Sequence, residues 1–538
     1  METKRLILAL VLTFAVFFGW QYFFPPAKVP APTTEQTSPA QSASQAATST
    51  TTSSAPVAAG EIVASEGKSV TITTPLYTAV FNTQGGLMES FKLTNYYKSI
   101  KPDAVTGVRE RIDMVSAPTL GLSIGAVNTW TSAEWDAAAS DASLEQGEHS
   151  LTFTGRADGY LIQRTLTFKA DNYTIAEDVR VTSETATSDA MTLGVSAGTN
   201  VLADAENMYN QTQIAWLDAA GIDSETDAED LAEEGLPVVP DVNWGGVENN
   251  YFLLAVQPAA AKNTLSGGVH DETSYFIRLD TVDGSIKSGE TKTFQNIYFV
   301  GPKERDLLAA ASEELAKAVY FGWSSFVAEP LLWFLVWVDQ FIGNYGISII
   351  ILTILIKLIF WPLSQKSYKS MEQMKRLQPM IQKLREKHGT DKQTLNTETM
   401  QLYKTYKVNP AGGCLPMVVQ IPVFFGLYRA LLGAVELRHA GFIDFVPFTD
   451  ITWLADLSAK DPFYVTPVVM GLTMLGQQLM SPSAGDPTQR KMMLLMPVVF
   501  TFLFLQFPAG LVIYWMVNNV LSIAQQWMIG RSAKTSKA

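Results

Sequence analysis

Cysteine is almost absent from this chain, whose 538 residues contain a single one, Cys414. An internal disulfide framework is therefore excluded, as is any zinc or iron–sulfur site built from clustered cysteines. No cysteine closely follows the apolar run near the N-terminus, which excludes a bacterial lipoprotein.

Charge is also scarce, because only 17% of the residues are Asp, Glu, Lys or Arg, against about a quarter in soluble globular proteins. The apolar residues must be concentrated somewhere, and this composition favours a membrane protein. The formal net charge of −13 argues against DNA as a partner.

The residue patterns of common enzymes are missing as well. The chain has no His-Glu-x-x-His and no Gly-x-Ser-x-Gly, and its four histidines are scattered. Gly67-Lys68-Ser69 resembles the end of a phosphate-binding loop, but Ile62 stands where the loop requires its first glycine. We therefore expect no metal, no cofactor and no enzymatic activity.

The first 24 residues predict a transmembrane anchor. Leu6 to Phe24 carries no charge and follows Lys4 and Arg5. The run is longer than the apolar part of a cleaved signal peptide, the alternative interpretation, and it ends in bulky aromatic residues. Residues 25–60, rich in Pro, Ala, Ser and Thr, are typical of a disordered linker.

Residues 61–325 predict an all-β domain of the sandwich type. Ser69 to Phe81 alternates, and further short runs at 151–154, 160–168, 173–181 and 290–300 are separated by turn residues. Residues 61 to 329 contain 17 basic and 39 acidic residues, which is compatible with a position outside the cytoplasm. We expect residues 307–320 to be helical.

The rest of the chain predicts an all-α transmembrane core. Residues 326–344 favour an amphipathic helix in the membrane interface, with Trp333, Trp337 and Phe341 four residues apart; an ordinary core-facing helix is the alternative. Five apolar stretches, each near the length of a membrane span, follow at 345–363, 414–432, 464–480, 492–507 and 509–528. The last four spans lie in the region 413–530.

Loop charges predict the orientation. Residues 364–410 contain ten Lys or Arg and four acids, and the short tail 531–538 contains Arg531, Lys534 and Lys537 without an acid. Basic loops face the cytoplasm. We therefore expect a multi-pass protein of a bacterial inner membrane, with both termini in the cytoplasm and the large β domain in the periplasm.

One ionisable residue, Lys357, lies inside a predicted span, where a charge costs about 2.5–3.5 kcal/mol. It could reach the interface by snorkelling. However, Thr353 and Ser364 share its helix face, and Tyr514, Asn518, Ser522 and Gln525 form a polar stripe on the last span. With Gln420, these residues favour a shared hydrated recess over simple interhelical hydrogen bonding.

Residues 364–412 predict a cytoplasmic helical hairpin broken at Gly389, with Thr390 or Asp391 as the cap of its second helix. Its net positive charge suits anionic lipid, ribosomal RNA or an acidic partner, although a solvated basic face without a partner is also possible. The candidate contact residues are Met371, Met374, Lys375, Arg376, Lys383 and Arg385.

Several motifs in order resemble the YidC/Oxa/Alb family of membrane protein insertases. They are Tyr345 to Thr353, Trp361-Pro362-Leu363, Tyr406 to Pro410 with Gly412 to Pro416, Gln420 to Phe424, and Phe507 to Leu511 with Tyr514 and Asn518. The resemblance covers roughly 330–530 closely, and the anchor, linker and β domain resemble the Gram-negative form.

The resemblance implies a five-helix core around a hydrophilic groove open to lipid and cytoplasm, plus a periplasmic β-supersandwich. Lys357 stands where the family carries an arginine, so the charge is kept but the bidentate fork is lost. Tyr514 or Trp515 matches a tyrosine of the groove. The short tail argues against strong ribosome binding through the tail.

The resulting expectation is an insertase and folding chaperone for newly made membrane proteins, acting alone or with the Sec translocon. Its other partners would be the lipid bilayer and, weakly through the cytoplasmic loops, the ribosome. The alternatives are a small-solute transporter that uses Lys357, which lacks the support of an internal repeat, and a cell-envelope enzyme whose β domain binds glycan.

Overall fold

The computed structural model describes residues 67–535 except 103–105, 116, 133, 138–139, 189, 201, 203–209, 271–272, 389–390, 409–414, 444–452 and 481–486. The predicted anchor and linker lie outside the described residues. The chain forms two compact units, here called the β domain (67–96, 111–301 and 307–317) and the helical unit (97–110, 302–306 and 318–535).

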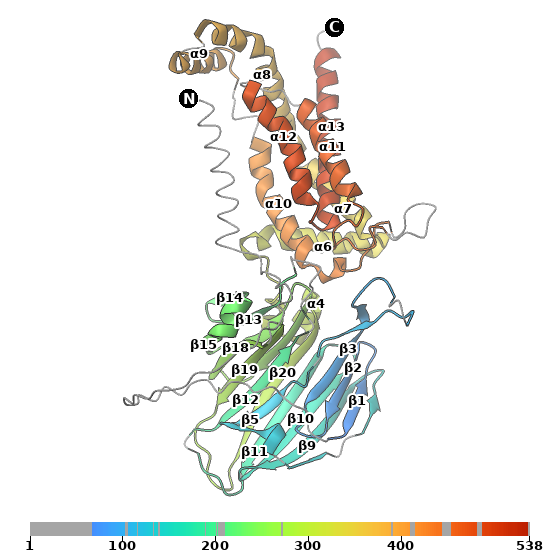
Figure 1. Ribbon diagram of the computed structural model, residues 1–538, viewed down its shortest axis with the longest axis vertical. Helices are drawn as coiled ribbons and strands as arrows, with labels where there is room; N and C mark the ends of the chain where they lie inside the picture. The colour runs from blue at the N-terminus through green and yellow to red at the C-terminus, as the bar shows by residue number, and fades with distance from the viewer. Residues whose placement is uncertain are drawn as a thin grey trace, which may run out of the picture. The chain divides into compact units, whose positions relative to one another are not determined.

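The β domain contains three sheets (Figure 1). The five-stranded sheet has the order β4 (Arg111–Asp113), β3 (Met88–Tyr97), β2 (Tyr77–Asn82), β1 (Ser69–Thr73) and β8 (Ala142–Ser143). The nine-stranded sheet has the order β14 (Gly221–Glu225), β13 (Gln213–Asp218), β16 (Trp244–Glu248), β17 (Phe252–Pro258), β20 (Thr291–Pro302), β11 (Thr174–Ser183), β10 (Tyr160–Lys169), β9 (Glu148–Ala157) and β7 (Glu134–Ala137). The six-stranded sheet has the order β15 (Leu236–Pro240), β18 (Asn263–His270), β19 (Ser274–Val282), β12 (Thr192–Thr199), β5 (Gly121–Ile124) and β6 (Val127–Asn128).

The predicted strands at 151–154, 160–168, 173–181 and 290–300 are confirmed as β9, β10, β11 and β20, which are neighbours in one sheet. The alternating run Ser69 to Phe81 is instead two strands, because Pro75, which has no N–H to donate, lies in the turn between β1 and β2. The helix expected at 307–320 is two short helices, α4 (Arg305–Ala311) and α5 (Glu313–Ala316), since Ser312 caps a new helix.

A fully buried ion pair joins two of these sheets. Arg164 of β10 donates from Nε to Glu177 Oε1 of β11 at 2.7 Å, and from Nη1 to the carbonyls of Gly85 and Gly86 in the turn between β2 and β3. Asn296 of β20 donates to the second Glu177 oxygen. Because a buried charge without partners costs several kcal/mol, this network fixes the five-stranded sheet against the nine-stranded one.

The helical unit contains eight helices of eight or more residues among the described residues. They are α6 (Ser325–Ile342), α7 (Tyr345–Ile359), α8 (Trp361–His388), α9 (Lys392–Thr405), α10 (Leu415–Gly433), α11 (Val465–Met480), α12 (Pro487–Phe504) and α13 (Ala509–Thr535). The prediction of an all-β domain followed by an all-α core is confirmed.

The span predicted as one helix over 345–363 is wrong at its end. Helix α7 stops at Ile359, and α8 begins at Trp361 with a bend of 65° between them. Pro362 explains the break, because it has no N–H to continue the hydrogen bonds of α7, whereas a proline is tolerated in the first turn of a new helix such as α8. The predicted hairpin at 364–412 therefore begins three residues earlier, directly after the bend.

Two other boundaries differ from the predictions. Helix α12 begins at Pro487 rather than 492 and ends at Phe504, so it is longer than the 16 residues expected, while α7 and α11 are the shorter ones. The tail predicted at 531–538 continues α13 as far as Thr535. The end of a helix is set by capping and packing, which hydropathy does not report.

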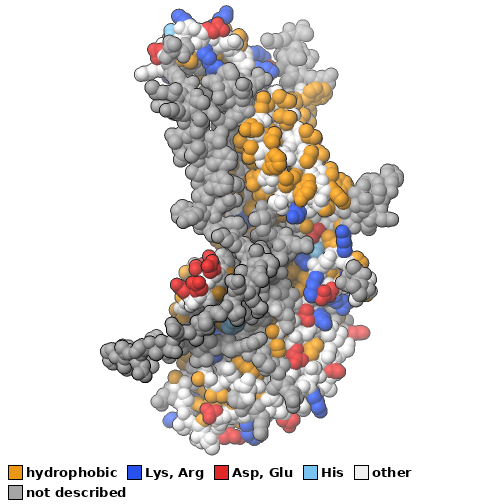
Figure 2. Space-filling model, in the orientation of Figure 1, with side chains coloured by type: hydrophobic (Ala, Val, Ile, Leu, Met, Phe, Trp, Pro, Cys, Tyr) orange, Lys and Arg blue, Asp and Glu red, His pale blue; other side chains and the backbone are white. Residues whose placement is uncertain are grey.

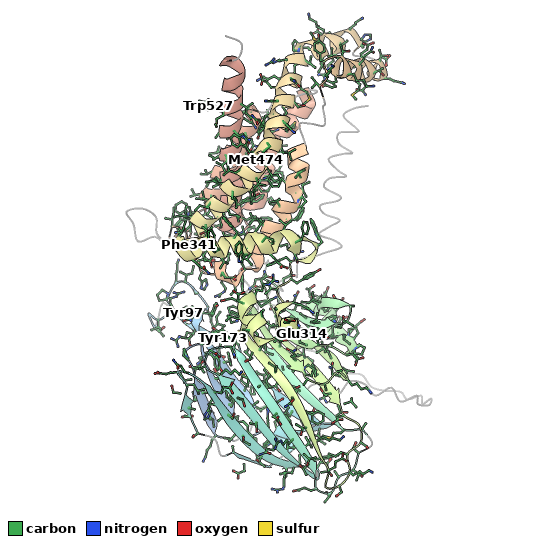
Figure 3. The ribbon with its side chains drawn as sticks, turned by 180° about the vertical axis from the view of Figure 1, so that it is seen from behind. Tyr97, Tyr173, Glu314, Phe341, Met474 and Trp527 are labelled. Carbon is green, nitrogen blue, oxygen red and sulfur yellow. The ribbon has the colours of Figure 1, made fainter. Side chains whose placement is uncertain are left out.

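Helix α6 runs across the ends of α7 and α10 within the helical unit (Figure 1). It buries Ala328, Leu335 and Val338 and exposes Trp333, Trp337 and Phe341, so the predicted amphipathic pattern is confirmed. Among the described helices, the segment Gly322–Ile342 is the one that by length and hydropathy could cross a membrane alone; α7 and α8 pass only as a bent pair. Phe341 is labelled at the end of this helix in Figure 3.

The helices pack around a common apolar core and approach closely where glycines allow it. Leu335, Leu352, Leu427, Met470 and Val512, from five different helices, belong to one buried cluster. At the start of α7, a Cβ on Gly346 would lie 2.5 Å from the Cβ of Phe442. The contact leaves no room for a methyl group.

We predict that Gly346→Ala destabilises the helical unit by about 1–3 kcal/mol, because the backbone near Phe442 must shift. The measurement is thermal unfolding of the purified full-length protein in detergent. Gly476→Ala is the matched control, since its added Cβ would meet only Ile523 at 3.6 Å, and alanine is the better helix former by about 1 kcal/mol. Equal melting temperatures for the two variants would contradict this packing.

Candidate functional site

The ammonium group of Lys357 points into the bundle and binds the last helix. Its Nζ donates a hydrogen bond to Ser522 Oγ of α13 at 2.7 Å, and Ser522 Oγ donates in turn to the backbone carbonyl of Asn518 at 2.7 Å. Ser522 is buried and Lys357 is half-buried. The lysine therefore has a partner at its own depth in the bundle, which favours the predicted recess over snorkelling.

A third helix joins through an amide pair. Gln420 of α10 donates from Nε2 to Asn518 Oδ1 of α13 at 3.1 Å. The polar groups of α7, α10 and α13 thus meet on one side of α13, along the stripe predicted from the spacing of its residues. Lys357, Gln420, Asn518 and Ser522 form what we call the polar strip.

Two predicted site residues lie elsewhere. Thr353 is fully buried, and its hydroxyl donates to the carbonyl of Ile349 in its own helix at 2.7 Å, so it offers no donor to the strip. Trp515 packs against Phe424, Phe500 and Phe504, with ring centroids 5.0–6.1 Å apart. Both share a helix face with residues of the strip, but a shared face does not place every side chain within hydrogen-bonding distance of the same partners.

Two polar side chains of α13 are buried without a hydrogen-bond partner among the described residues. They are Tyr514, through its hydroxyl, and Gln525, which is 1% exposed and leaves both its amide nitrogen and oxygen unpaired. They stand 11 residues apart, about 16 Å along a helix, with Ser522 and Asn518 between them. Both groups therefore lower the stability of the bundle relative to apolar side chains of the same shape.

Asn519 is a residue that the sequence analysis missed. It is buried on the opposite flank of the stripe and donates from Nδ2 to Thr473 Oγ1 of α11 at 3.3 Å. A second asparagine directly after Asn518, on an otherwise apolar helix, was the signal that could have found it. This contact ties α13 to α11.

The hairpin beyond the bend is confirmed as two helices, α8 and α9, with Asp391 as the N-cap of α9. A small apolar core holds it together, formed by Met374, Leu377 and Val408 with Met371, Ile381, Leu402 and Tyr403 packed around them. Met374 is therefore a core residue of the hairpin and is not available on its surface.

The charged candidates of the hairpin differ in availability. Lys375 and Lys383 are exposed, and neither forms an ion pair with a described residue. Arg376 pairs with Glu372 at 2.8 Å, and Arg385 is half-buried. Figure 2 shows charged side chains gathered over the hairpin and hydrophobic ones over the part of the bundle that contains α11 and α12. Exposed apolar residues on those two helices include Leu472, Leu479, Leu495 and Phe502.

Two family models match the chain. One, described as "60Kd inner membrane protein", matches residues 337–537, and the other, described as "YidC periplasmic domain", matches residues 69–334. A protein of Maridesulfovibrio salexigens named "Membrane protein insertase YidC" is 50% identical over 545 residues, which cover 99% of this chain and 100% of that protein. A protein of Oleidesulfovibrio alaskensis with the same name is 50% identical over 542 residues, with the same coverage of each chain.

Among solved structures, one described as "Active YidC insertase crystal structure with the first transmembrane domain resolved" is similar. It is 20% identical, has a TM-score of 0.37, and the match covers 86% of this chain and 93% of that one.

We predict opposite stability effects for two buried amides of α13. Gln525→Leu should leave the melting temperature unchanged or raise it, because an unpaired buried amide costs about 1–3 kcal/mol. Asn519→Leu should lower it, because the bond to Thr473 is lost. Thermal unfolding in detergent measures both, and a marked loss in Gln525→Leu would show that bound water already satisfies that amide.

Proposed function

The chain belongs to the YidC family of membrane protein insertases, and from that premise we propose that it integrates newly made proteins into a bacterial inner membrane through the polar strip of α7, α10 and α13. The observation that carries the proposal is the hydrogen bond between Lys357 Nζ and Ser522 Oγ at 2.7 Å. It holds a cation among apolar helices, beside the paired amides of Gln420 and Asn518. No covalent chemistry is required.

The charge of Lys357 is what the strip offers to a substrate. Its partner Ser522 is a neutral hydroxyl, and no described carboxylate forms an ion pair with it. The predicted spans contain no Asp or Glu at all. An uncompensated cation in a medium of lowered dielectric attracts a carboxylate more strongly than one in water, so acidic residues of a translocated tail are drawn part-way into the membrane.

Short helices support the same role. Helix α7 has 15 residues and α11 has 16, lengths of about 22 and 24 Å against a hydrocarbon core of about 30 Å. A bilayer adapts to short helices by thinning around them. The dry path that a polar tail must cross becomes shorter beside the strip.

The orientation in the membrane is part of the proposal and rests on the basic charges of the loops. We place both termini and the hairpin in the cytoplasm and the β domain in the periplasm. We place the exposed aromatic face of α6 in the periplasmic interface of the inner membrane, where Trp is favoured. Exposed Lys375 and Lys383 are suited to weak contact with the ribosome, and the exposed apolar residues of α11 and α12 to lipid, to substrate helices or to the Sec translocon.

We predict that Lys357→Ala slows insertion of a substrate with an acidic translocated tail on the order of tenfold, because about 1.4 kcal/mol of lost attraction changes a rate by that factor. Lys357→Arg should retain activity, since the charge is kept. The measurement is insertion into proteoliposomes of a matched pair of substrates, identical except for acidic or neutral tail residues. The neutral-tailed substrate should be affected least.

Two controls make this result specific. Thr353→Val, one turn earlier, should change nothing, because the threonine hydroxyl bonds within its own helix. Lys366→Ala removes an exposed lysine of α8 and should affect both substrates little. Equal losses for the two substrates would reject electrostatic attraction in favour of a packing role, and solute uptake without insertion would favour the transporter.

We predict that the double variant Lys375→Glu and Lys383→Glu reduces co-sedimentation of the full-length protein with ribosomes, and that wild-type binding weakens as salt rises, because exposed charges are screened. Lys460→Glu, an exposed lysine outside the hairpin, is the matched control. Ribosome binding that is equal in the three proteins would remove the hairpin from this contact.

A further inference from the structure

An arginine near the end of α10 is exposed on a largely apolar helix. Arg429 lies four residues before Gly433, the last residue of α10, and that helix contains no Asp or Glu. Arg429 forms no ion pair with a residue that the structure describes. The sequence analysis singled out Lys357 and missed this second cation, although residue 429 lies within the predicted span 414–432.

The two cations differ in what they face. Lys357 turns into the bundle and binds Ser522, whereas Arg429 is exposed on the surface of the helical unit. The four residues from Arg429 to the end of α10 correspond to about 6 Å along a helix, a distance that an arginine side chain can span. With the membrane orientation proposed above, α10 ends at the periplasmic interface, so the guanidinium group lies at the level of the lipid headgroups.

Exposed aromatic rings lie beside this arginine. Phe425 is one turn before Arg429 and therefore on the same face of α10. Its ring contacts that of Trp323, with centroids 6.0 Å apart and an interplanar angle of 57°. Phe425 is 43% exposed, Trp323 is 64% exposed, and Phe326, three residues further along, is 70% exposed. The cation thus borders an apolar surface built from two segments of the chain.

Close packing fixes these two segments against each other. A Cβ on Gly426 of α10 would lie 2.8 Å from Val327 Cγ1 and 3.2 Å from the backbone nitrogen of Ala328, both on α6. Ala328 and Ala430 also share a small buried cluster with Phe321. The exposed rings and the arginine therefore keep their relative positions, and a ligand that binds both does not have to order them first.

A phospholipid matches this combination of groups. A guanidinium group binds the oxygens of a phosphate in pairs, an indole N–H is a further donor, and Trp is favoured at the depth of the headgroups. The apolar rings of Phe425 and Phe326 suit the upper part of an acyl chain. Free phosphate would leave these rings in water and gain nothing from them.

We propose that Arg429, Trp323 and Phe425 form a binding site for an anionic phospholipid. Arg429 binds the phosphate, the indole of Trp323 donates to a headgroup oxygen, and Phe425 and Phe326 pack against the acyl chain. The bound lipid holds α10 and the start of α6 together at their exposed edge. Its location in the periplasmic leaflet rests on the proposed function, whereas the binding itself does not.

The test titrates the full-length protein in detergent with phosphatidylglycerol, which is anionic, or with phosphatidylcholine of identical acyl chains, which is zwitterionic, and counts bound lipids by native mass spectrometry. Wild type should bind one phosphatidylglycerol about fivefold more tightly, a factor equivalent to about 1 kcal/mol for one arginine near a lipid headgroup. Arg429→Gln should lose this preference, and Trp323→Leu should bind both lipids more weakly. Neither variant should change the melting temperature without lipid, because both side chains are exposed.

Two controls make the result specific. Lys375→Gln removes the same charge from an exposed position of the hairpin and should keep the preference. Excess inorganic phosphate at constant ionic strength should not displace the lipid. Equal binding of the two lipids by wild type, an unchanged preference in Arg429→Gln, or displacement by phosphate would each overturn the proposal. Because no substrate is present, these failures are distinct from a failure of the insertase role, which the Lys357 variants test.

Discussion

An ammonium group on an apolar helix needs a polar partner at its own depth, and much of the helical unit follows from how that need is met. Lys357 finds Ser522 on α13, which brings α7 and α13 together along a line of polar residues. Gln420 adds α10 through Asn518, and Asn519 adds α11 through Thr473. Helix α13 thus bonds to three others while its apolar residues fill the common core. The contacts that stabilise the buried charge of Lys357 therefore also hold the helices of the bundle together.

The sequence predicted these partners better than it predicted where helices end. Spacing alone put Tyr514, Asn518, Ser522 and Gln525 on one face, and an intramembrane lysine drew attention to them. It could not show that Thr353 bonds to Ile349 of its own helix, since a threonine in a helix has that option as well as an outward one. Nor did hydropathy reveal the break at Phe360, because Trp361 to Leu363 continues the apolar run. The signal was Pro362, which has no N–H to continue the preceding helix.

In the β domain, local alternation predicted individual strands but not their neighbours. Strands β11 and β20 pair although more than a hundred residues separate them, and that choice depends on long-range packing. Arg164 illustrates the difference: in the sequence it is an ordinary charge in an alternating strand, whereas in the fold it is fully buried against Glu177. Buried polar residues on β strands were thus the feature least visible from the sequence.

The bend at Phe360 has a mechanical consequence. Helix α8 has 28 residues, a length of about 42 Å, and one residue separates it from the helix that carries Lys357. A force applied near His388 therefore acts through a long moment arm on α7, and a small rotation at the bend becomes a large displacement of the hairpin. The Met374, Leu377 and Val408 core lets α8 and α9 move as one lever. The bend is thus the point through which any rotation of the hairpin reaches the helix that carries Lys357.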